Sequence, residues 1–324
     1  MLNRGDNMKK IIVISVMLCV VLISCKKASL PAAADNPEIN PIVTFAAKWG
    51  NYGTGDGQFS YPSGIAASAA GDVYVVDQDN NRIQKFTSEG VFVTKWGNQG
   101  TEDGQLSYPC GIAVDSTGNI YVTEYGNARI QKFTSAGVFI TKWGSFGTED
   151  GKFWNPSDVA IDSTGNVYVS DSGNRRIQKF SSEGVFITKW GSQGTEDGQF
   201  GYPYGIAIDS ADNIYVADEN NDRIHKFTST GVFVAKWGSE GTADGQFNDP
   251  CGVEVDSASN IYVVDSTNSR IQKLTSTGVF ITKWGSEGTA DGQFDGPDGI
   301  AVDTTGNIYV TDMYNDRIQK FVEQ

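Results

Sequence analysis

Residues 48–94 read KWGNYGTGDGQFSYPSGIAASAAGDVYVVDQDNNRIQKFTSEGVFVT, and at Lys95 the same text begins again. The distance from Trp49 to Trp96 is 47 residues. The same spacing separates the tryptophans that follow, which are Trp143, Trp190, Trp237 and Trp284. A fixed period of this length indicates a repeat architecture, so the array has to be interpreted before any single motif.

Each repeat contains the pattern of four short strands. In the second repeat, residues 112–115 and 120–123 are apolar and β-branched, residues 129–133 alternate polar and apolar, and residues 138–143 form a last apolar run. Turn clusters rich in Gly, Asn and Ser separate these runs. A helical array of similar period is disfavoured because no run is long enough for a helix, and the Gly-His and Trp-Asp pairs of WD40 blades are absent. We predict an all-β fold, a six-bladed β-propeller of four-stranded blades.

The two ends of the array predict how the ring closes. The sixth repeat stops at Gln324, after its third strand. Residues 42–49 have the pattern of the missing fourth strand, yet they precede the first full repeat. We expect residues 42–49 to complete the last blade, which removes an exposed sheet edge. The propeller domain is therefore predicted to span residues 42–324.

The recurring text resembles the NHL repeat. It reads Pro-x-Gly-Ile-Ala-Val-Asp, then Asn-Ile-Tyr-Val-x-Asp, then Asn-x-Arg-Ile-Gln-Lys-Phe, with copies beginning near Pro62, Pro109, Pro156, Pro203, Pro250 and Pro297. The resemblance implies a propeller fold. It does not decide the function, because NHL-like propellers serve as binding platforms, receptor sensor domains, RNA-binding domains and a few enzymes.

The N-terminus predicts export and a lipid anchor. Met8-Lys9-Lys10 is a short basic segment, and residues 11–23 are apolar but too short for a usual membrane span. The segment ends in Leu22-Ile23-Ser24-Cys25, which resembles the lipobox of bacterial lipoproteins. We predict a signal peptide at residues 1–24, lipidation of Cys25, and a flexible tether over residues 25–41. The alternative is an ordinary secretory signal with an incidental cysteine. The predicted location is the cell envelope, on the outer membrane.

Charge and composition restrict the classes of partner and of chemistry that are open to this chain. The formal net charge is −14, and no basic run is present, which argues against nucleic acid. The single histidine, His225, removes most His-based catalysis and His-ligated zinc, and we expect it to face solvent on an outer strand. Cys110 and Cys251 lie 141 residues apart, which is three repeats. We expect them on opposite walls of the ring as free thiols.

Positions that carry the same type of residue in all repeats are predicted to have a structural role. An acid is followed by Asn three residues later and Arg five residues later, as in Asp77, Asn80 and Arg82. This set could form a ring of ligand sites, but identical use in every blade favours a structural carboxylate–guanidinium joint. The tryptophans of the Lys-Trp-Gly motifs are expected to pack between blades.

Positions that differ between repeats predict the binding face. They concentrate in the loops after each Lys-Trp-Gly and between the second and third strands, which lie on one face of a propeller. The residues that we expect to bind ligand are Tyr61, Tyr108, Tyr125, Trp154, Asp158, Tyr202, Tyr204, Asp249, Glu254, Asp298 and Tyr314. Rings and carboxylates together suit a peptide, a glycan, a cationic small molecule or an envelope protein. The alternative is that the rings only cover their own loops.

Two residues of the inner strands depart from the repeat. Asp158 replaces a Gly and Glu254 replaces an Ala that the other five blades use. A carboxylate in the channel wall must be paired or solvated, so these residues could line the pore, bind a cation or meet an Arg. We predict a non-catalytic binding propeller without cofactor, although a calcium ion in the channel is possible. The alternative is a metal-dependent enzyme, similar to lactonases, other hydrolases or lyases, with its site in the channel mouth.

Overall fold

The structure is a computed structural model that describes residues 41–324. The predicted signal segment 1–24, Cys25 and the tether up to residue 40 lie outside the described residues. Among the described residues, no helix is long and apolar enough to cross a membrane.

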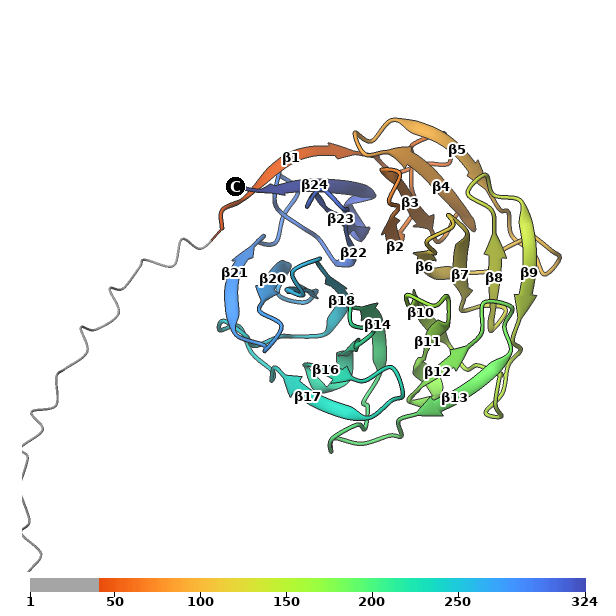
Figure 1. The fold of residues 1–324 in the computed structure, drawn as a ribbon. Helices are drawn as coiled ribbons and strands as arrows, with labels where there is room; N and C mark the ends of the chain where they lie inside the picture. The colour runs from red at the N-terminus through yellow and green to blue at the C-terminus, as the bar shows by residue number, and fades with distance from the viewer. Residues whose placement is uncertain (1–40) are drawn as a thin grey trace, which may run out of the picture. The chain divides into compact units, whose positions relative to one another are not determined.

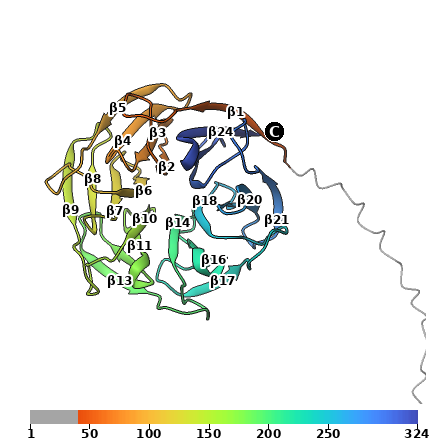
Figure 2. The ribbon, with the colours of Figure 1, turned by 180° about the vertical axis from the view of Figure 1, so that it is seen from behind.

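Six sheets of four antiparallel strands stand in a ring, as predicted (Figures 1 and 2). The inner strands begin at the prolines and are β2 (Pro62–Ala67), β6 (Pro109–Val114), β10 (Pro156–Ile161), β14 (Pro203–Ile208), β18 (Pro250–Val255) and β22 (Pro297–Val302). The second strands are β3 (Asp72–Asp77), β7 (Ile120–Glu124), β11 (Val167–Asp171), β15 (Ile214–Asp218), β19 (Ile261–Asp265) and β23 (Ile308–Asp312).

The third strands carry the Arg-Ile-x-Lys pattern and are β4 (Arg82–Thr87), β8 (Arg129–Phe133), β12 (Arg176–Phe180), β16 (Arg223–Phe227), β20 (Arg270–Leu274) and β24 (Arg317–Glu323). The outer strands of the first five blades are β5 (Phe92–Trp96), β9 (Phe139–Trp143), β13 (Phe186–Trp190), β17 (Phe233–Trp237) and β21 (Phe280–Trp284). Short 3-10 turns follow the second strand in three blades, namely η1 (Ser172–Asn174), η2 (Glu219–Asn221) and η3 (Met313–Asn315).

The N-terminal strand closes the ring. Strand β1 (Val43–Trp49) pairs antiparallel with β24, from Val43 opposite Glu323 to Trp49 opposite Ile318. The last sheet therefore has the order β1-β24-β23-β22, which joins the two ends of the described chain in one blade. This confirms the predicted closure.

Apolar side chains hold neighbouring blades together. Each buried cluster combines residues of two adjacent blades, for example Tyr215 of β15 with Val263 of β19. The tryptophans at the ends of the outer strands contribute to these contacts. The ring of Trp96 lies 6.2 Å from that of Tyr74 in its own blade and 6.0 Å from that of Phe133 in the next. The prediction that these tryptophans pack between blades is confirmed.

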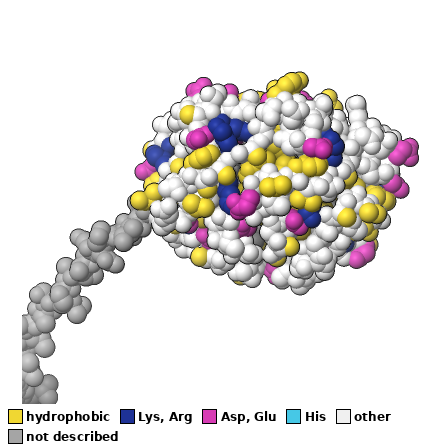
Figure 3. Space-filling model, turned by 90° about the horizontal axis from the view of Figure 1, so that it is seen from above, with side chains coloured by type: hydrophobic (Ala, Val, Ile, Leu, Met, Phe, Trp, Pro, Cys, Tyr) yellow, Lys and Arg dark blue, Asp and Glu magenta, His cyan; other side chains and the backbone are white. Residues whose placement is uncertain are grey.

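The outer edge of the ring alternates charged pairs with apolar side chains (Figure 3). Lys142 pairs with Asp103, and the same pair recurs at Lys236 and Asp197. Because these pairs are exposed, each contributes little to stability.

Candidate functional site

A buried carboxylate anchors the loops of every blade. In the first blade, Asp77 is fully buried and accepts hydrogen bonds from Arg82 Nε at 2.6 Å, Gln84 Nε2 at 3.0 Å and the Ser60 amide at 2.8 Å. The guanidinium of Arg82 then donates to the carbonyl of Thr54 and to other carbonyls of the same loop. The equivalent ion pairs are Arg129–Glu124, Arg176–Asp171, Arg223–Asp218, Arg270–Asp265 and Arg317–Asp312. We call the six acids the framework carboxylates, and the prediction of a structural joint is confirmed.

His225 does not face solvent, so that prediction is wrong. It occupies the framework position that Gln84 occupies in the first blade, and it is fully buried. Its Nε2 lies 3.4 Å from Asp218 Oδ2, and neither ring nitrogen makes a hydrogen bond in the structure. Burial lowers the pKa of His225, which keeps the imidazole neutral. The alternation along the third strand was predicted correctly, but the face that carries Gln and His points inward.

Two sets of loops meet on one face of the ring, which we call the rim face. They are the loops that follow each Lys-Trp-Gly and the loops between the second and third strands. Within the second blade, the Tyr125 amide donates to the Tyr108 carbonyl at 3.0 Å. Between blades, the Tyr108 amide donates to Asn81 Oδ1 at 2.8 Å. The rim face is therefore a continuous surface rather than six separate loops.

All the exposed aromatic side chains among residues 41–324 lie on the rim face. They are between 41% and 74% exposed and comprise Tyr52, Tyr61, Tyr108, Tyr125, Phe146, Trp154 and Tyr314. Tyr61 and Tyr314 belong to different blades, and their ring centroids lie 5.5 Å apart. The rings of Phe146 and Trp154 lie 6.2 Å apart. Sequence reasoning missed Tyr52 and Phe146, although they differ from the Gln or Glu found at the same loop position elsewhere.

The backbone before the prolines helps to set this surface. Tyr61, Tyr108 and Asp249 have φ values of 58°, 46° and 51°. A left-handed conformation is uncommon for bulky residues and costs of order 1 kcal/mol or more, which neighbouring contacts must offset. The Tyr61 amide donates to Asp316 Oδ1 and the Asp249 amide to Asp222 Oδ1, each at 3.0 Å. Contacts with the preceding blade thus fix these rim residues.

Tyr202 and Tyr204 connect the rim face to the channel. Their rings stack 6.5 Å apart, and the Arg175 guanidinium lies 4.8 Å from the centroid of Tyr202. Tyr204 belongs to β14, yet its hydroxyl lies 3.6 Å from the Sγ of Cys110 on β6, two blades away. It also packs against the cluster that contains Cys251. Tyr204 therefore extends across the rim end of the channel.

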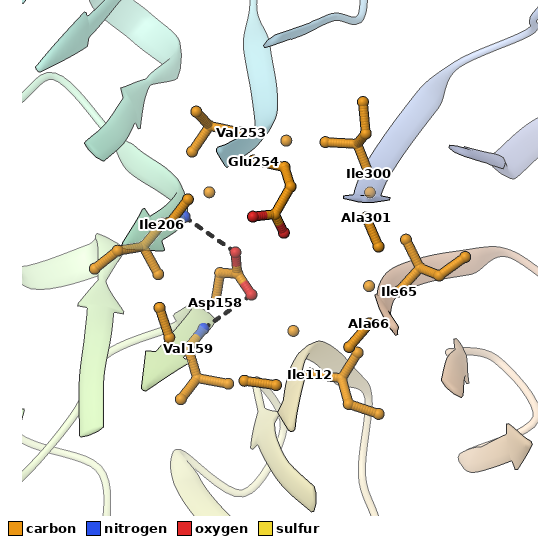
Figure 4. Close-up of a pocket in the computed structure, with 18 of the residues that line it drawn as sticks. Ile65, Ala66, Ile112, Asp158, Val159, Ile206, Val253, Glu254, Ile300 and Ala301 are labelled. Atoms are coloured by element: carbon orange, nitrogen blue, oxygen red, sulfur yellow. Dashed lines mark hydrogen bonds between the residues drawn. The ribbon is translucent and has the colours of Figure 1, made fainter. Parts of the chain in front are cut away.

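The channel itself is a cavity of about 200 Å³ lined by the six inner strands. Asp158 and Glu254 project into it from β10 and β18 (Figure 4). Asp158 accepts hydrogen bonds from the amides of Ile206 at 3.0 Å and Val159 at 2.8 Å, and Glu254 accepts one from the Val255 amide at 2.8 Å. Neither carboxylate makes an ion pair, so of the three roles that the sequence leaves open, meeting an Arg is not observed among the described residues.

Burial controls the titration of these groups. Desolvation raises the pKa of Asp158 to about 7 and the pKa of Glu254 to about 7, and the charge of Asp158 adds to the shift of Glu254. Desolvation also raises the pKa of Asp298, at the rim end of the channel, to about 6. The channel leaves part of Asp158 and Glu254 accessible to water, although protein surrounds both.

Cys110 and Cys251 are free thiols, as predicted, and both are buried. They lie on β6 and β18, which are three blades apart in the ring. Desolvation raises the pKa of the Cys110 thiol to about 12, so it remains protonated at neutral pH. No three His, Cys, Asp or Glu side chains within residues 41–324 gather in a group that could hold a metal ion.

A family model, the NHL repeat, matches five segments of the chain. The NHL repeat matches residues 59–86, 106–133, 153–180, 200–227 and 294–321. The matched segments do not include residues 247–274, which carry Glu254. Five of the six blades of the β-propeller thus carry a segment that matches the NHL repeat.

Curated relatives are similar to this chain over short segments. A segment of 50 residues is 44% identical to the B-box type zinc finger protein ncl-1 of Caenorhabditis elegans, covering 15% of this chain and 6% of that protein. Over 50 residues the chain is also 44% identical to the protein brain tumor of Drosophila melanogaster, covering 15% of this chain and 5% of that protein. The chain thus spans only a small fraction of the length of these relatives.

Solved structures resemble the whole ring. A protein of unknown function from Bacteroides thetaiotaomicron has a TM-score of 0.68 at 21% identity, covering 87% of this chain and 76% of that chain. Virginiamycin B lyase from Staphylococcus aureus has a TM-score of 0.60 at 16% identity, covering 87% and 99%. A gluconolactonase from Xanthomonas campestris has a TM-score of 0.61 at 14% identity, covering 83% and 88%. At these identities the likeness extends to the fold alone.

Proposed function

We propose that this chain is a non-catalytic binding propeller of the bacterial cell envelope, and that the rim face binds a peptide or glycan segment of an envelope partner. The observation that carries the proposal is the placement of every exposed aromatic side chain of the described residues on the rim face. Aromatic rings supply flat apolar contact at low entropic cost, and Tyr hydroxyls add hydrogen bonds.

The acidic side chains of the rim face restrict the class of ligand that it can bind. Asp249 is exposed and accepts a hydrogen bond from Thr267, and Glu219 lies half-buried beside it. Arg175, the one basic side chain of the loops between the second and third strands apart from the framework arginines, stacks on Tyr202. An acidic surface with rings favours a peptide that carries Lys or Arg, or a glycan whose hydroxyls donate to carboxylates.

We also propose that a lipid anchor at Cys25 holds the protein on the outer membrane. Nucleic acid is not a partner in this proposal. The support is the sequence of the N-terminal segment and the formal charge of −14. Replacing Cys25 with Ser is expected to move the protein from the membrane fraction to the soluble fraction. Unchanged partition of the C25S variant would contradict the anchor.

Binding is tested with arrays of glycans and of basic peptides, followed by titration of each hit. Trp154→Ala and Tyr108→Ala are each expected to weaken binding about tenfold or more, because aromatic anchors dominate such interfaces. Val138→Ala is the matched control, since Val138 is similarly exposed but lies in a turn on the opposite face. Loss of binding in V138A, or full binding in both rim variants, would refute the proposal.

A second candidate is a metal-dependent enzyme of the lactonase, hydrolase or lyase type. The observation that favours it is the pair of carboxylates inside the channel mouth. A bound ion would supply Lewis-acid activation there, but Asp158, Glu254 and Asp298 do not form a group that could hold an ion among the described residues, so the ion would have to draw them together. Metal content and melting before and after chelation decide between the candidates. One tightly bound calcium ion, with a lower melting temperature after EDTA, would favour the enzyme.

A further inference from the structure

The channel carboxylates are exceptions within a sixfold internal comparison. At the position of Asp158 the other five blades have Gly, and at the position of Glu254 they have Ala. Gly and Ala complete the same strands in the same ring, so the fold does not need either acid. Each acid instead adds a carboxylate that protein surrounds, which costs free energy unless a cation or hydrogen-bond donors compensate.

Asp298 supplies a separate observation from a third blade. It is only 8% exposed and lines the channel beside Tyr204. Among the described residues no basic side chain pairs with its carboxylate, and the donors beside it are the Tyr204 hydroxyl and the Cys251 thiol, which moderate the rise of its pKa. A carboxylate that is more than nine-tenths buried and has only these two neutral side-chain donors beside it keeps acceptor capacity for a ligand.

The wall of the channel contains no compensating charge. The residues that line the cavity are small or aliphatic apart from Asp158, Glu254, Asp298, Tyr204, Ser157 and Cys110, and none of them is Lys, Arg or His. The three acids lie at successive depths in the channel, as their distances from the proline that begins each inner strand show. Asp298 is the first residue after its proline, Asp158 is the second and Glu254 is the fourth. They are distributed along the channel axis rather than gathered around one point.

From this arrangement we infer that the channel binds a linear alkylammonium ion, such as a primary amine or a polyamine. An ammonium group is compact and has three N–H donors, which suits carboxylates that reach in from separate strands. The alkyl stem would lie against the small Ala66 and Ala301 side chains, which line the cavity on the side away from Asp158 (Figure 4). A second ammonium group of a polyamine would meet Asp298 at the rim end.

Tyr204 controls the entry in this arrangement. Its side chain extends over the cavity from β14 to the Cys110 thiol, so a ligand from the rim side must pass it. Its ring can then cover the bound cation, which a π face attracts. This site goes beyond the rim proposal. A rim that fails to bind peptides and glycans would leave it unaffected, because the two proposals use different side chains.

The test is calorimetric titration of the full chain with spermidine and with n-pentylammonium at about pH 8, where the carboxylates are ionised. We expect saturable binding of one molecule per chain. The variant D158G/E254A restores the residues of the other blades, so it should fold, and we expect it to bind at least about tenfold more weakly. D298N is a second variant, with an expected loss for spermidine greater than for n-pentylammonium.

The controls separate a built site from attraction to an acidic protein. E102A removes one exposed loop carboxylate and should leave the affinity unchanged. n-Pentanol has the same alkyl chain without charge and should not bind. Equal affinity in the wild type and D158G/E254A, equal binding of n-pentanol, or displacement of the amine by stoichiometric calcium would overturn the inference.

Discussion

The framework carboxylates and the channel carboxylates, which are Asp158, Glu254 and Asp298, have opposite environments. Each framework carboxylate receives an Arg, an Asn and, in five blades, a Gln, together with a backbone amide, as Asp77 does. The channel carboxylates receive at most two backbone amides, and Asp298 receives none. The first set is repeated in every blade, whereas each member of the second occurs once.

This difference indicates that the framework carboxylates stabilise the fold, whereas the channel carboxylates are expected to have another role. A carboxylate that is satisfied by several donors supports the loops, and its removal leaves buried partners unpaired. A carboxylate that replaces Gly or Ala and has no ion-pair partner destabilises the ring. Its expected use is to receive something that is not part of the chain.

The largest expected effect is on the framework. Arg176→Met leaves Asp171 buried without its guanidinium and should lower the free energy of unfolding by about 3 to 5 kcal/mol. The matched control is Lys189→Met in the same blade, which removes an exposed pair with Asp150 and should change the free energy by less than about 1 kcal/mol. Denaturant unfolding measures both. Equal losses would show that the framework pair has no special weight.

Removing the channel carboxylates, in contrast, should stabilise the protein. D158G/E254A is expected to raise the free energy of unfolding by about 2 kcal/mol at about pH 8, because the acids there are ionised and poorly compensated. The folded-state pKa of each acid is raised to about 7. Their cost is therefore absent below the unfolded-state value of about 4 and complete above about pH 7. Melting curves across this range should show a gap between variant and wild type that widens as pH rises, and a constant gap would contradict it.

The fourth blade has His225 at the position where the other five blades have Gln beside the framework carboxylate, and substituting it tests the role of that position. His225→Gln restores the acceptor that the Gly198 amide lacks and that Gln272 provides for the Gly245 amide at 2.9 Å. We expect a gain of about 1 kcal/mol in the free energy of unfolding. Because burial lowers the pKa of His225, wild-type stability should fall as pH drops below about 6.5, the unfolded-state value.

Denaturant unfolding at about pH 7.5 and about pH 5.5 compares the two proteins. The acid-dependent part of the loss should be smaller in H225Q. If H225Q is less stable than the wild type at both pH values, the imidazole makes a contact that Gln cannot replace.

The smallest expected effect is at the rim face. Tyr108→Ala and Trp154→Ala remove exposed rings and should change the free energy of unfolding by less than about 0.5 kcal/mol. Thermal melting measures both. A loss of several kcal/mol would mean that the rings support their own loops, which is the alternative that the sequence left open.

The fold could be predicted because the repeat supplies six readings of one pattern. The period of the tryptophans, the alternation of the strands and the missing strand at Gln324 each point to a closed ring, and β1 pairs with β24 as expected. The inward face of the third strand could not be assigned. Alternation shows that Gln131 and Lys132 point to opposite sides, but it does not show which side the carboxylate of Glu124 occupies.

For the candidate site, the sequence indicates which residues to consider but not how they are arranged. Variable loop positions identified most of the exposed rings, yet their pairing across blades depends on the left-handed backbone at Tyr61 and on the ring geometry. Asp158 and Glu254 were found as exceptions to the repeat. Their distance from any basic side chain, and the course of Tyr204 across the channel, follow only from the closed ring.

The most direct test of the contrast between framework and channel is infrared spectroscopy of the carboxyl groups. The spectrum at about pH 5 minus that at about pH 8, compared between the wild type and D158G/E254A, isolates the two channel acids. We predict a protonated carboxyl band in the wild type that disappears with a midpoint near pH 7 and is missing from the variant. Identical difference spectra would show that both acids are already ionised at about pH 5, and would contradict the claim that the channel holds uncompensated carboxylates.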